Sequence, residues 1–194
     1  MASSHHMLFE GNESFNYDSD NTHGNAIYMT VFRNHLSGFR RDYRGLANGR
    51  GAGWNYGSWW HSFVGNVLGI SGRMEGWRYE NIGLGANVNN PFGGPPPVWI
   101  LGYQSGQWDQ AADAKVLSTV IRDGDFDYVT GQVRWDTSAQ PIRNSLYLPT
   151  KPAFFGNYTW PWVDPTGSTK LFSLPAKARY DAGTRFAPSA GARP

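Results

Sequence analysis

The residues best suited to chemistry lie in one polar run near the start of the sequence, where Asp18, Asp20 and His23 follow one another closely. In an extended segment residues 18 and 20 face the same way, and a following turn would bring His23 beside them. Two carboxylates and imidazoles can ligate zinc or manganese, with His35 and His61 as further candidate ligands from neighbouring strands. A metal held there would activate water for ester hydrolysis.

The same acidic residues allow two other interpretations. The spacing matches no established metal signature, and Asp and Asn side chains in a polar corner also make Asx turns, with His23 bonded to a backbone carbonyl. Glycoside cleavage is the second alternative, because it needs two carboxylates at a set separation. The candidates for such a pair are Glu10, Asp18, Asp20 and Asp42.

A second acidic run, Asp123-Gly124-Asp125-Phe126-Asp127, resembles a calcium loop only superficially. Tyr128 stands where the EF-hand pattern needs Gly, and Arg134 where it needs Glu. On a strand the three carboxylates would line one side and could hold calcium. A turn rich in Asp is the simpler interpretation.

Aromatic residues suggest sugar binding, because exposed rings stack on the apolar faces of sugar rings. The opposing interpretation is that these rings fill the core, since a small domain has little interior to cover. The predicted substrate-binding residues are Trp54, Tyr56, Trp59, Trp60, Arg40 and Arg41.

A repeated sequence motif, in which a pair of apolar or aromatic residues precedes an Asn, indicates the elements that would position these residues. The copies end at Asn12, Asn34 and Asn66, and the first two are 22 positions apart. Layers stacked at this spacing would align the Asn side chains in a hydrogen-bonded ladder. The pattern predicts an all-β fold, a right-handed parallel β-helix (solenoid) truncated at its N-terminus.

Composition excludes several other classes. The chain has 194 residues, no cysteine, 24 Gly, 12 Pro and a formal charge of +2, which favours turn-rich β structure without disulfides. The small net charge argues against nucleic acid as a partner, and no stretch is long and apolar enough for a membrane helix. The compartment is left open.

The predicted organisation follows the repeat. Residues 1–7 are interpreted as an expression leader, 8–140 as solenoid coils and 141–194 as an irregular wrap and tail rich in Pro and aromatic residues. Loops are expected at about 40–56 and 86–97, where Gly and Pro accumulate. Further strands are predicted over 114–121 and 126–135.

Several phrases resemble bacterial right-handed parallel β-helix proteins of the pectate-lyase-like superfamily, and the likeness suggests a carboxy-terminal fragment of such a protein. The resemblance implies a polysaccharide or related small-molecule substrate, and a secreted or cell-surface parent. Lyases of this type use calcium, clustered acids and a basic side chain. The phrases are Asp18–Asn25, Val31–Asn34, Val120–Tyr128, Ser145–Leu148 and Lys151–Gly156.

Three hypotheses for function follow. The first is a carbohydrate-active or carbohydrate-binding protein, similar to a polysaccharide lyase or glycoside hydrolase. The second is a metal-dependent hydrolase of phosphoesters that uses the Asp/His cluster with zinc, manganese or calcium. The third is a non-catalytic assembly module, which would form a homo-oligomer through the uncapped N-terminal coil.

Overall fold

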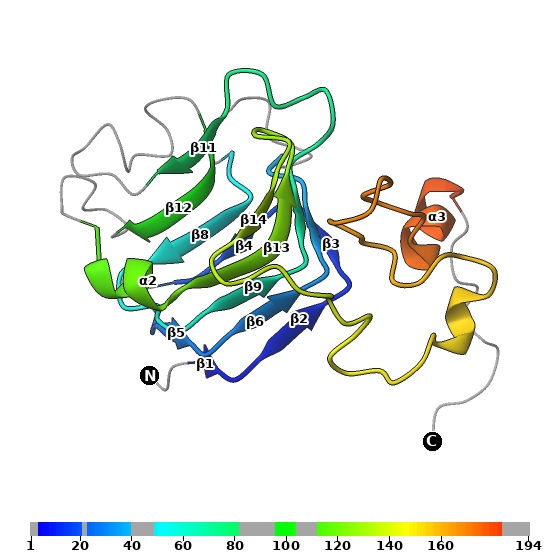
Figure 1. Ribbon diagram of the computed structural model, residues 1–194, viewed down its shortest axis with the longest axis horizontal. Helices are drawn as coiled ribbons and strands as arrows, with labels where there is room; N and C mark the ends of the chain where they lie inside the picture. Colours follow the sequence, from blue (N-terminus) through cyan, green and yellow to red (C-terminus); the bar gives the residue numbers. More distant parts are fainter. Residues whose placement is uncertain (1–3, 21–22, 40–48, 82–95, 104–111, 184–194) are drawn as a thin grey trace.

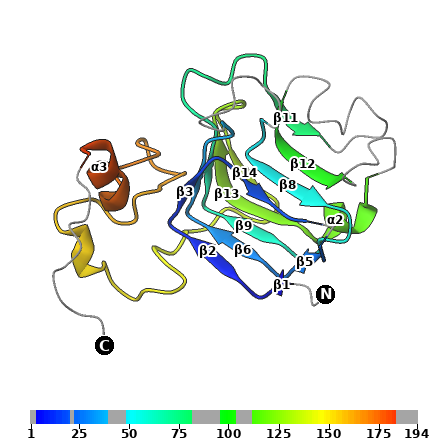
Figure 2. The same ribbon diagram turned by 180° about the vertical axis from the view of Figure 1, so that it is seen from behind.

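The computed structural model describes residues 4–20, 23–39, 49–81, 96–103 and 112–183 (Figure 1). Short strands dominate the described chain, and nearly all of them pair in parallel. They stack in layers, and the C-terminal segment lies beside the layers on the side of β3 (Figure 2). The position of the C-terminal segment beside the layers creates the space in which a ligand could bind.

The strands form three sheets. The largest follows the order β2 (Leu8–Glu10), β6 (Thr30–Phe32), β9 (Ser62–Val64), β13 (Ile121–Asp127), β10 (Val67–Leu68), β7 (His35–Leu36) and β3 (Glu13–Ser14), with β14 (Val133–Trp135) added antiparallel to β13. The second follows β11 (Arg78–Asn81), β12 (Pro97–Tyr103), β8 (Ala52–Asn55) and β4 (Tyr17–Asp18). The third pairs β1 (Ser4–His5) with β5 (Ala26–Ile27).

The prediction of an all-β right-handed parallel β-helix is wrong. The parallel strands are divided among several sheets, the largest of which curls into half a barrel, and short helices are part of the fold (Figure 1). The described residues show no clear solenoid. The Asn repeat specifies which strands are neighbours, because each Asn needs the adjacent layer, but it does not specify how the sheets close.

The predicted Asn ladder is confirmed. Asn12 Nδ2 donates to Asn34 Oδ1 at 3.0 Å, and Asn34 Nδ2 donates to Asn66 Oδ1 at 3.1 Å. Each Oδ1 also accepts the backbone N–H of the preceding Asn, at 2.8 and 2.9 Å. The last member is Asp125, whose Oδ1 accepts both the N–H and Nδ2 of Asn66 at 2.8 Å. The ladder therefore fixes the register of four successive layers.

Asp125 terminates the ladder in a fully buried position, 1% exposed. Burial raises its pKa from the ordinary value of 3.8 to about 8, although the bonds from Asn66 and the charge of Arg122 oppose the shift. Its Oδ2 has no hydrogen-bond partner among the described residues. The carboxyl group is therefore protonated in the folded protein at neutral pH.

This burial predicts a stability difference between the wild type and Asp125→Asn. The raised pKa means that the folded state keeps a proton that the unfolded chain releases, so this group's contribution to stability is lost as pH rises from about 4 towards 8. At pH 8 the variant should be more stable by about 1.4 kcal/mol or more, the free energy of one pKa unit. Urea unfolding of both proteins at pH 4 and pH 8 measures this difference. A gap that does not widen with pH contradicts the prediction.

Arg33 has an unusual backbone conformation. The residue just before the ladder member in each layer has positive φ: 70° at Gly11, 50° at Arg33, 71° at Gly65 and 68° at Gly124. Glycine adopts this conformation readily, whereas other L-residues do so at a cost. An arginine here therefore indicates a specific use for its side chain.

The core lies between the sheets and is rich in aromatic rings. Trp54 on β8 and Trp99 on β12 stack at 5.5 Å with an interplanar angle of 12°, and Phe63 on β9 packs edge-on against both. All three side chains are at most 1% exposed. Contacts between the two larger sheets thus account for much of the buried apolar surface.

Three segments differ from their predicted local structure. Residues 114–119 form helix α2 (Ala114–Thr119) rather than a strand, because Asp113 caps the helix by accepting the N–H of Lys115. The segment predicted to be a loop at about 40–56 contains buried strand β8, whereas 40–48 lie outside the described residues. In the predicted strand over 126–135, a turn at 128–132 separates β13 from β14.

Residues 4–6, within the predicted leader, belong to the fold. Strand β1 pairs with β5, and the ring of His6 stacks on Tyr28 at 4.8 Å. Tyr28 stacks in turn on Trp60 at 4.9 Å, with an interplanar angle of 9°. The three aromatic residues share positive φ and form an exposed column along one corner of the layers.

The C-terminal segment, residues 137–183, is largely irregular. It contains the 3₁₀ helix η1 (Ala153–Phe155), helix α3 (Pro175–Asp181) and a β-bridge between Val163 and Leu171. Phe155, Trp162 and Val163 join Val67 and Phe126 in a second apolar cluster. The segment is therefore docked on the largest sheet by its own small core.

Candidate functional site

A cavity of about 1280 Å³ lies where the C-terminal segment meets the strand layers. One wall comes from residues in and after β2, β3, β6 and β7, and the other comes from the segment that carries η1 and α3 (Figure 2). The lining residues that matter for chemistry are Glu10, Glu13, Phe15, Arg33, His35, Phe39, Arg73, Asn144, Phe154, Trp160, Trp162, Lys177 and Tyr180.

Arg33 holds the two walls together. Its guanidinium donates to the carbonyl oxygens of Arg143 at 2.7 Å, Val163 at 2.5 Å and Ile142 at 2.9 Å. The residue is only 6% exposed, so these bonds form in a largely water-free environment. The positive φ of Arg33 directs its side chain to the C-terminal segment instead of continuing the glycine column.

Glu10 and Trp162 reinforce this attachment. Glu10 Oε2 accepts the N–H of Leu146 at 2.9 Å, and its other oxygen accepts the hydroxyl of Ser145. Trp162 Nε1 donates to the carbonyl oxygen of Gly11 at 2.8 Å. Glu10, predicted as a member of a glycosidase pair, thus has both oxygens engaged in structural bonds.

Polar groups with separate roles line the sheet side. His35 Nε2 bonds the carbonyl oxygen of Gly69 at 2.9 Å, and burial lowers the pKa of His35, so its imidazole is neutral at pH 7. Glu13 stands opposite His35 in the register of β3 and β7. The guanidinium of Arg73 lies over the ring of Phe39 at 4.3 Å. Donors and acceptors of both charges therefore face the cavity.

Aromatic rings line the other side. Phe154 is 65% exposed and Tyr180 is 68% exposed, while Trp160 is half-buried. These rings come from the C-terminal segment, and Phe39 faces them from the sheet side of the same cavity. Exposed rings above polar groups provide both stacking surfaces and hydrogen-bonding partners for a ligand.

The predicted Asp18, Asp20 and His23 cluster lies in an exposed corner and is held in two separate pairs. Asp18 on β4 forms an ion pair with Arg50 and accepts Asn16 Nδ2 at 2.7 Å. His23 Nδ1 lies 2.5 Å from Asp20 Oδ2, with both side chains largely exposed. No sequence pattern indicated that Arg50 is the partner of Asp18.

The other two predicted metal ligands lie in the interior. His35 lines the cavity, and His61 is 1% exposed, with Nε2 bonded to the carbonyl oxygen of Ala26 at 2.9 Å. Burial lowers the pKa of His61 to about 4. Among residues with described positions, no three His, Asp or Glu side chains are grouped as a metal site would require. The zinc, manganese or calcium site stays a prediction.

The carboxylates of the second acidic run point to different partners. Asp123 accepts Thr137 Oγ1 at 2.7 Å, Asp125 ends the Asn ladder, and Asp127 accepts the N–H of Thr130 at 2.7 Å. Each therefore stabilises a different local structure. The run lies on strand β13, so the turn interpretation is wrong, and the three carboxylates are engaged with separate partners.

The predicted sugar-binding aromatic residues lie in different environments. Trp54 is fully buried, Tyr56 is 50% exposed, and Trp60 is 37% exposed. Trp59 donates Nε1 to Asp113 at 2.9 Å, and Lys115 lies over both Trp59 and Trp60. Because Tyr28 and Lys115 stack on Trp60, its ring faces are already engaged. Arg40 and Arg41, like Asp42, lie outside the described residues.

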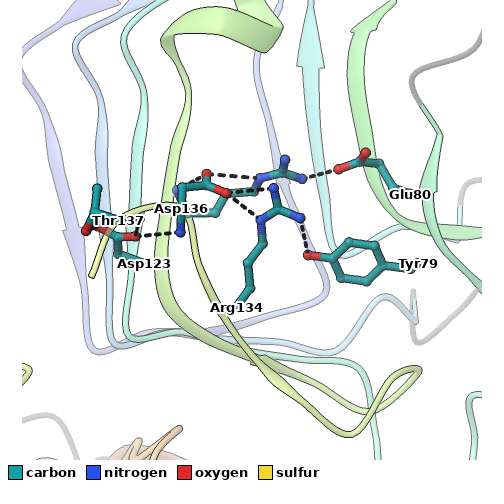
Figure 3. Close-up of polar contacts among 7 residues, drawn as sticks. Tyr79, Glu80, Asp123, Arg134, Asp136 and Thr137 are labelled. Atoms are coloured by element: carbon teal, nitrogen blue, oxygen red, sulfur yellow. Dashed lines mark hydrogen bonds and ion pairs between the residues drawn. The ribbon is translucent and has the colours of Figure 1, made fainter. Parts of the chain in front are cut away.

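An ion-pair network that sequence reasoning missed links β11, β13 and β14 (Figure 3). Arg122 pairs with Glu80 and lies 3.6 Å from Asp136, and Arg134 pairs with Asp136 at 2.6 Å. Arg134 also donates to Tyr79 Oη at 3.2 Å, while burial raises the pKa of Tyr79. Arg134, a charge inside the strand predicted over 126–135, was the available signal. Since every carboxylate here has a basic partner, the network joins the sheets rather than offering a free acid.

Comparisons with protein-family models, curated proteins and solved structures find no match to this chain. The resemblance to the pectate-lyase-like superfamily therefore stays a prediction. No helix in the described part of the chain is long and apolar enough to span a bilayer.

Proposed function

We propose that this chain binds an oligosaccharide in the cavity between the strand layers and the C-terminal segment, and that it does not cleave it. The observation that carries the proposal is the pairing of exposed rings from η1 and α3 with polar side chains of the sheet wall. Phe154 and Tyr180 offer apolar faces, and Glu13 and Arg73 offer an acceptor and donors.

The size of the cavity supports a ligand of several rings. Its volume of about 1280 Å³ exceeds the range of roughly 300–1,000 Å³ that is usual for small-molecule pockets. A short oligosaccharide is long, amphipathic and rich in hydroxyl groups. It therefore matches both the volume and the combination of aromatic and polar lining residues.

The carboxylates of the cavity favour binding over cleavage. Glycoside cleavage uses two carboxyl groups that flank the scissile bond. Glu10 and Glu13 are the carboxylates among the described lining residues, and Glu10 is engaged by Ser145 and Leu146. Glu13 would have to act alone. The hypothesis of a metal-dependent phosphoesterase has no supporting observation among the described residues.

Phe154→Ala tests this proposal. The side chain is 65% exposed, so its removal should leave the fold intact while removing a stacking surface. We expect oligosaccharide affinity to fall about 2- to 10-fold, as for the loss of one aromatic contact of about 0.5–1.5 kcal/mol. Isothermal titration with neutral and acidic oligosaccharides of increasing length measures this effect.

The matched control is Tyr147→Ala, an 80% exposed aromatic residue of the same segment that is not among the cavity-lining residues. It should bind as the wild type does. No binding of any oligosaccharide by the wild type, or equal losses in both variants, would refute the proposal.

A further inference from the structure

The first layer of strands presents an open edge. In chain order β1, β2, β3 and β4 cover residues 4–18, and each lies at the end of its sheet: β1 in the two-stranded sheet, β2 and β3 at opposite ends of the largest sheet, and β4 at one end of the four-stranded sheet (Figure 1). One continuous row of backbone groups therefore faces outward without a neighbouring strand in the described residues.

The Asn ladder shows what this row lacks. Oδ1 of Asn34 and of Asn66 each accepts two hydrogen bonds from the Asn of the preceding layer. The amides of Asn34 and Asn66 also donate to carbonyl oxygens of that preceding layer, those of Phe9 and Val31. Asn12 is exposed, and within the described ranges nothing donates to its Oδ1. Its acceptor position and one amide hydrogen are therefore available.

Apolar side chains of the same layer are equally uncovered. Met7 is 46% exposed and Phe9 is half-buried, whereas the equivalent residues of the next layer, Met29 and Val31, are 3% and 1% exposed. The next layer buries its apolar residues because another layer lies on each side of it. One more strand paired with β2 would bury the apolar side chains of the first layer in the same way.

We infer that this edge binds an extended segment of another polypeptide, which adds as a parallel strand. The segment carries a four-residue motif: an apolar residue, then any residue, then Gly, then Asn. The Asn would donate its N–H and Nδ2 to Asn12 Oδ1, as Asn12 does to Asn34. Gly would take the positive φ seen at Gly11 and Gly65. The apolar residue would cover Phe9, as Val31 and Phe63 pair in the next layers. This is strand addition to a sheet edge, with the ladder as the source of specificity.

A second copy of the chain, the partner in the predicted homo-oligomer, fits this edge less well. Its Asn34 and Asn66 are buried, and β14 already pairs with its β13. Its own first layer could meet this edge only by twofold pairing, in which the two β2 strands run antiparallel. The parallel ladder would not continue across such a contact.

The test uses a fluorescently labelled peptide with the sequence of this chain's own third repeat, residues 61–69, and a second peptide in which the residue equivalent to Asn66 is alanine. Anisotropy titration of the intact protein should show saturable binding of the first peptide and about fivefold weaker binding of the second, the expected effect of one lost hydrogen bond, because alanine keeps the backbone N–H. Asn12→Ala should bind both peptides equally weakly, and Asn157→Ala, an exposed residue of the C-terminal segment, should behave as the wild type.

Two results would overturn the inference. One is the absence of saturable binding, or equal binding of both peptides by the wild type. The other is a dimer in sedimentation experiments that Leu8→Lys dissociates, without peptide binding, because it would assign the edge to a second copy. Circular dichroism confirms that each variant is folded. Asn12 also lies in the wall of the cavity, but the peptides are titrated without oligosaccharide, so failure of this inference and failure of the proposed function remain distinguishable.

Discussion

Replacing Arg33 with alanine is expected to lower the free energy of unfolding by about 3–5 kcal/mol, because three hydrogen bonds from one buried guanidinium disappear together. The carbonyl oxygens of Ile142, Arg143 and Val163 lose their donors, and the C-terminal segment loses its main attachment to the strand layers. Urea denaturation measures the loss. Trypsin should also cleave after the exposed Arg143, which precedes Asn144, faster than in the wild type.

Arg33→Gly distinguishes the contribution of the Arg33 side chain from that of its backbone conformation. It removes the same three hydrogen bonds but relieves the positive φ of 50° that alanine would retain. We expect it to be more stable than Arg33→Ala by about 0.5–1 kcal/mol, with the same rapid cleavage after Arg143. Slow cleavage in both variants would show that Arg33 does not hold the segment in place.

Replacing Asn66 with alanine is expected to cost about 4 kcal/mol or more, since four buried hydrogen bonds of the ladder depend on its side chain. Two are accepted from Asn34, one is donated to Val31, and one is donated to Asp125. The residue has no exposed surface, so water cannot replace the lost partners. Thermal and urea unfolding measure the loss.

Asn12→Ala is the control for position along the ladder. Asn12 donates one side-chain bond to Asn34, and its side chain is exposed to water. The cost should therefore stay below about 1 kcal/mol. Equal losses at Asn12 and Asn66 would show that the ladder contributes no more in the interior than at its exposed end.

Part of the fold was predictable because the Asn residues that form the ladder are visible in the sequence as a repeat. An amide that bonds the next layer requires parallel neighbours in a fixed register, and this was predicted correctly. The fourth member was not recognised, because Asp125 replaces Asn, and Arg122 and Asp123 stand where Phe63 and Val64 form the apolar pair. Closure of the sheets depends on contacts between distant residues such as Trp54 and Trp99, which no local pattern indicates.

The cavity was harder to predict than the ladder. Glu10 and His35 were singled out for acid or metal chemistry, but their partners are Ser145, Leu146 and Gly69. These pairings depend on where the C-terminal segment docks, which its Pro-rich sequence does not specify. One signal was available: Arg33 occupies the position that Gly11 and Gly65 hold in the other copies of the repeat.

The attachment of the C-terminal segment has a consequence for the order of folding. The ladder joins residues 22, 32 and 59 positions apart, whereas the bonds from Arg33 to Val163 and from Trp162 to Gly11 span 130 and 151 positions. Contacts of long sequence separation are slow to form, because a large loop must close first. We therefore expect the layers to assemble before the segment docks. The cavity would then be completed last, and the chain would gain its binding capacity only at the end of folding.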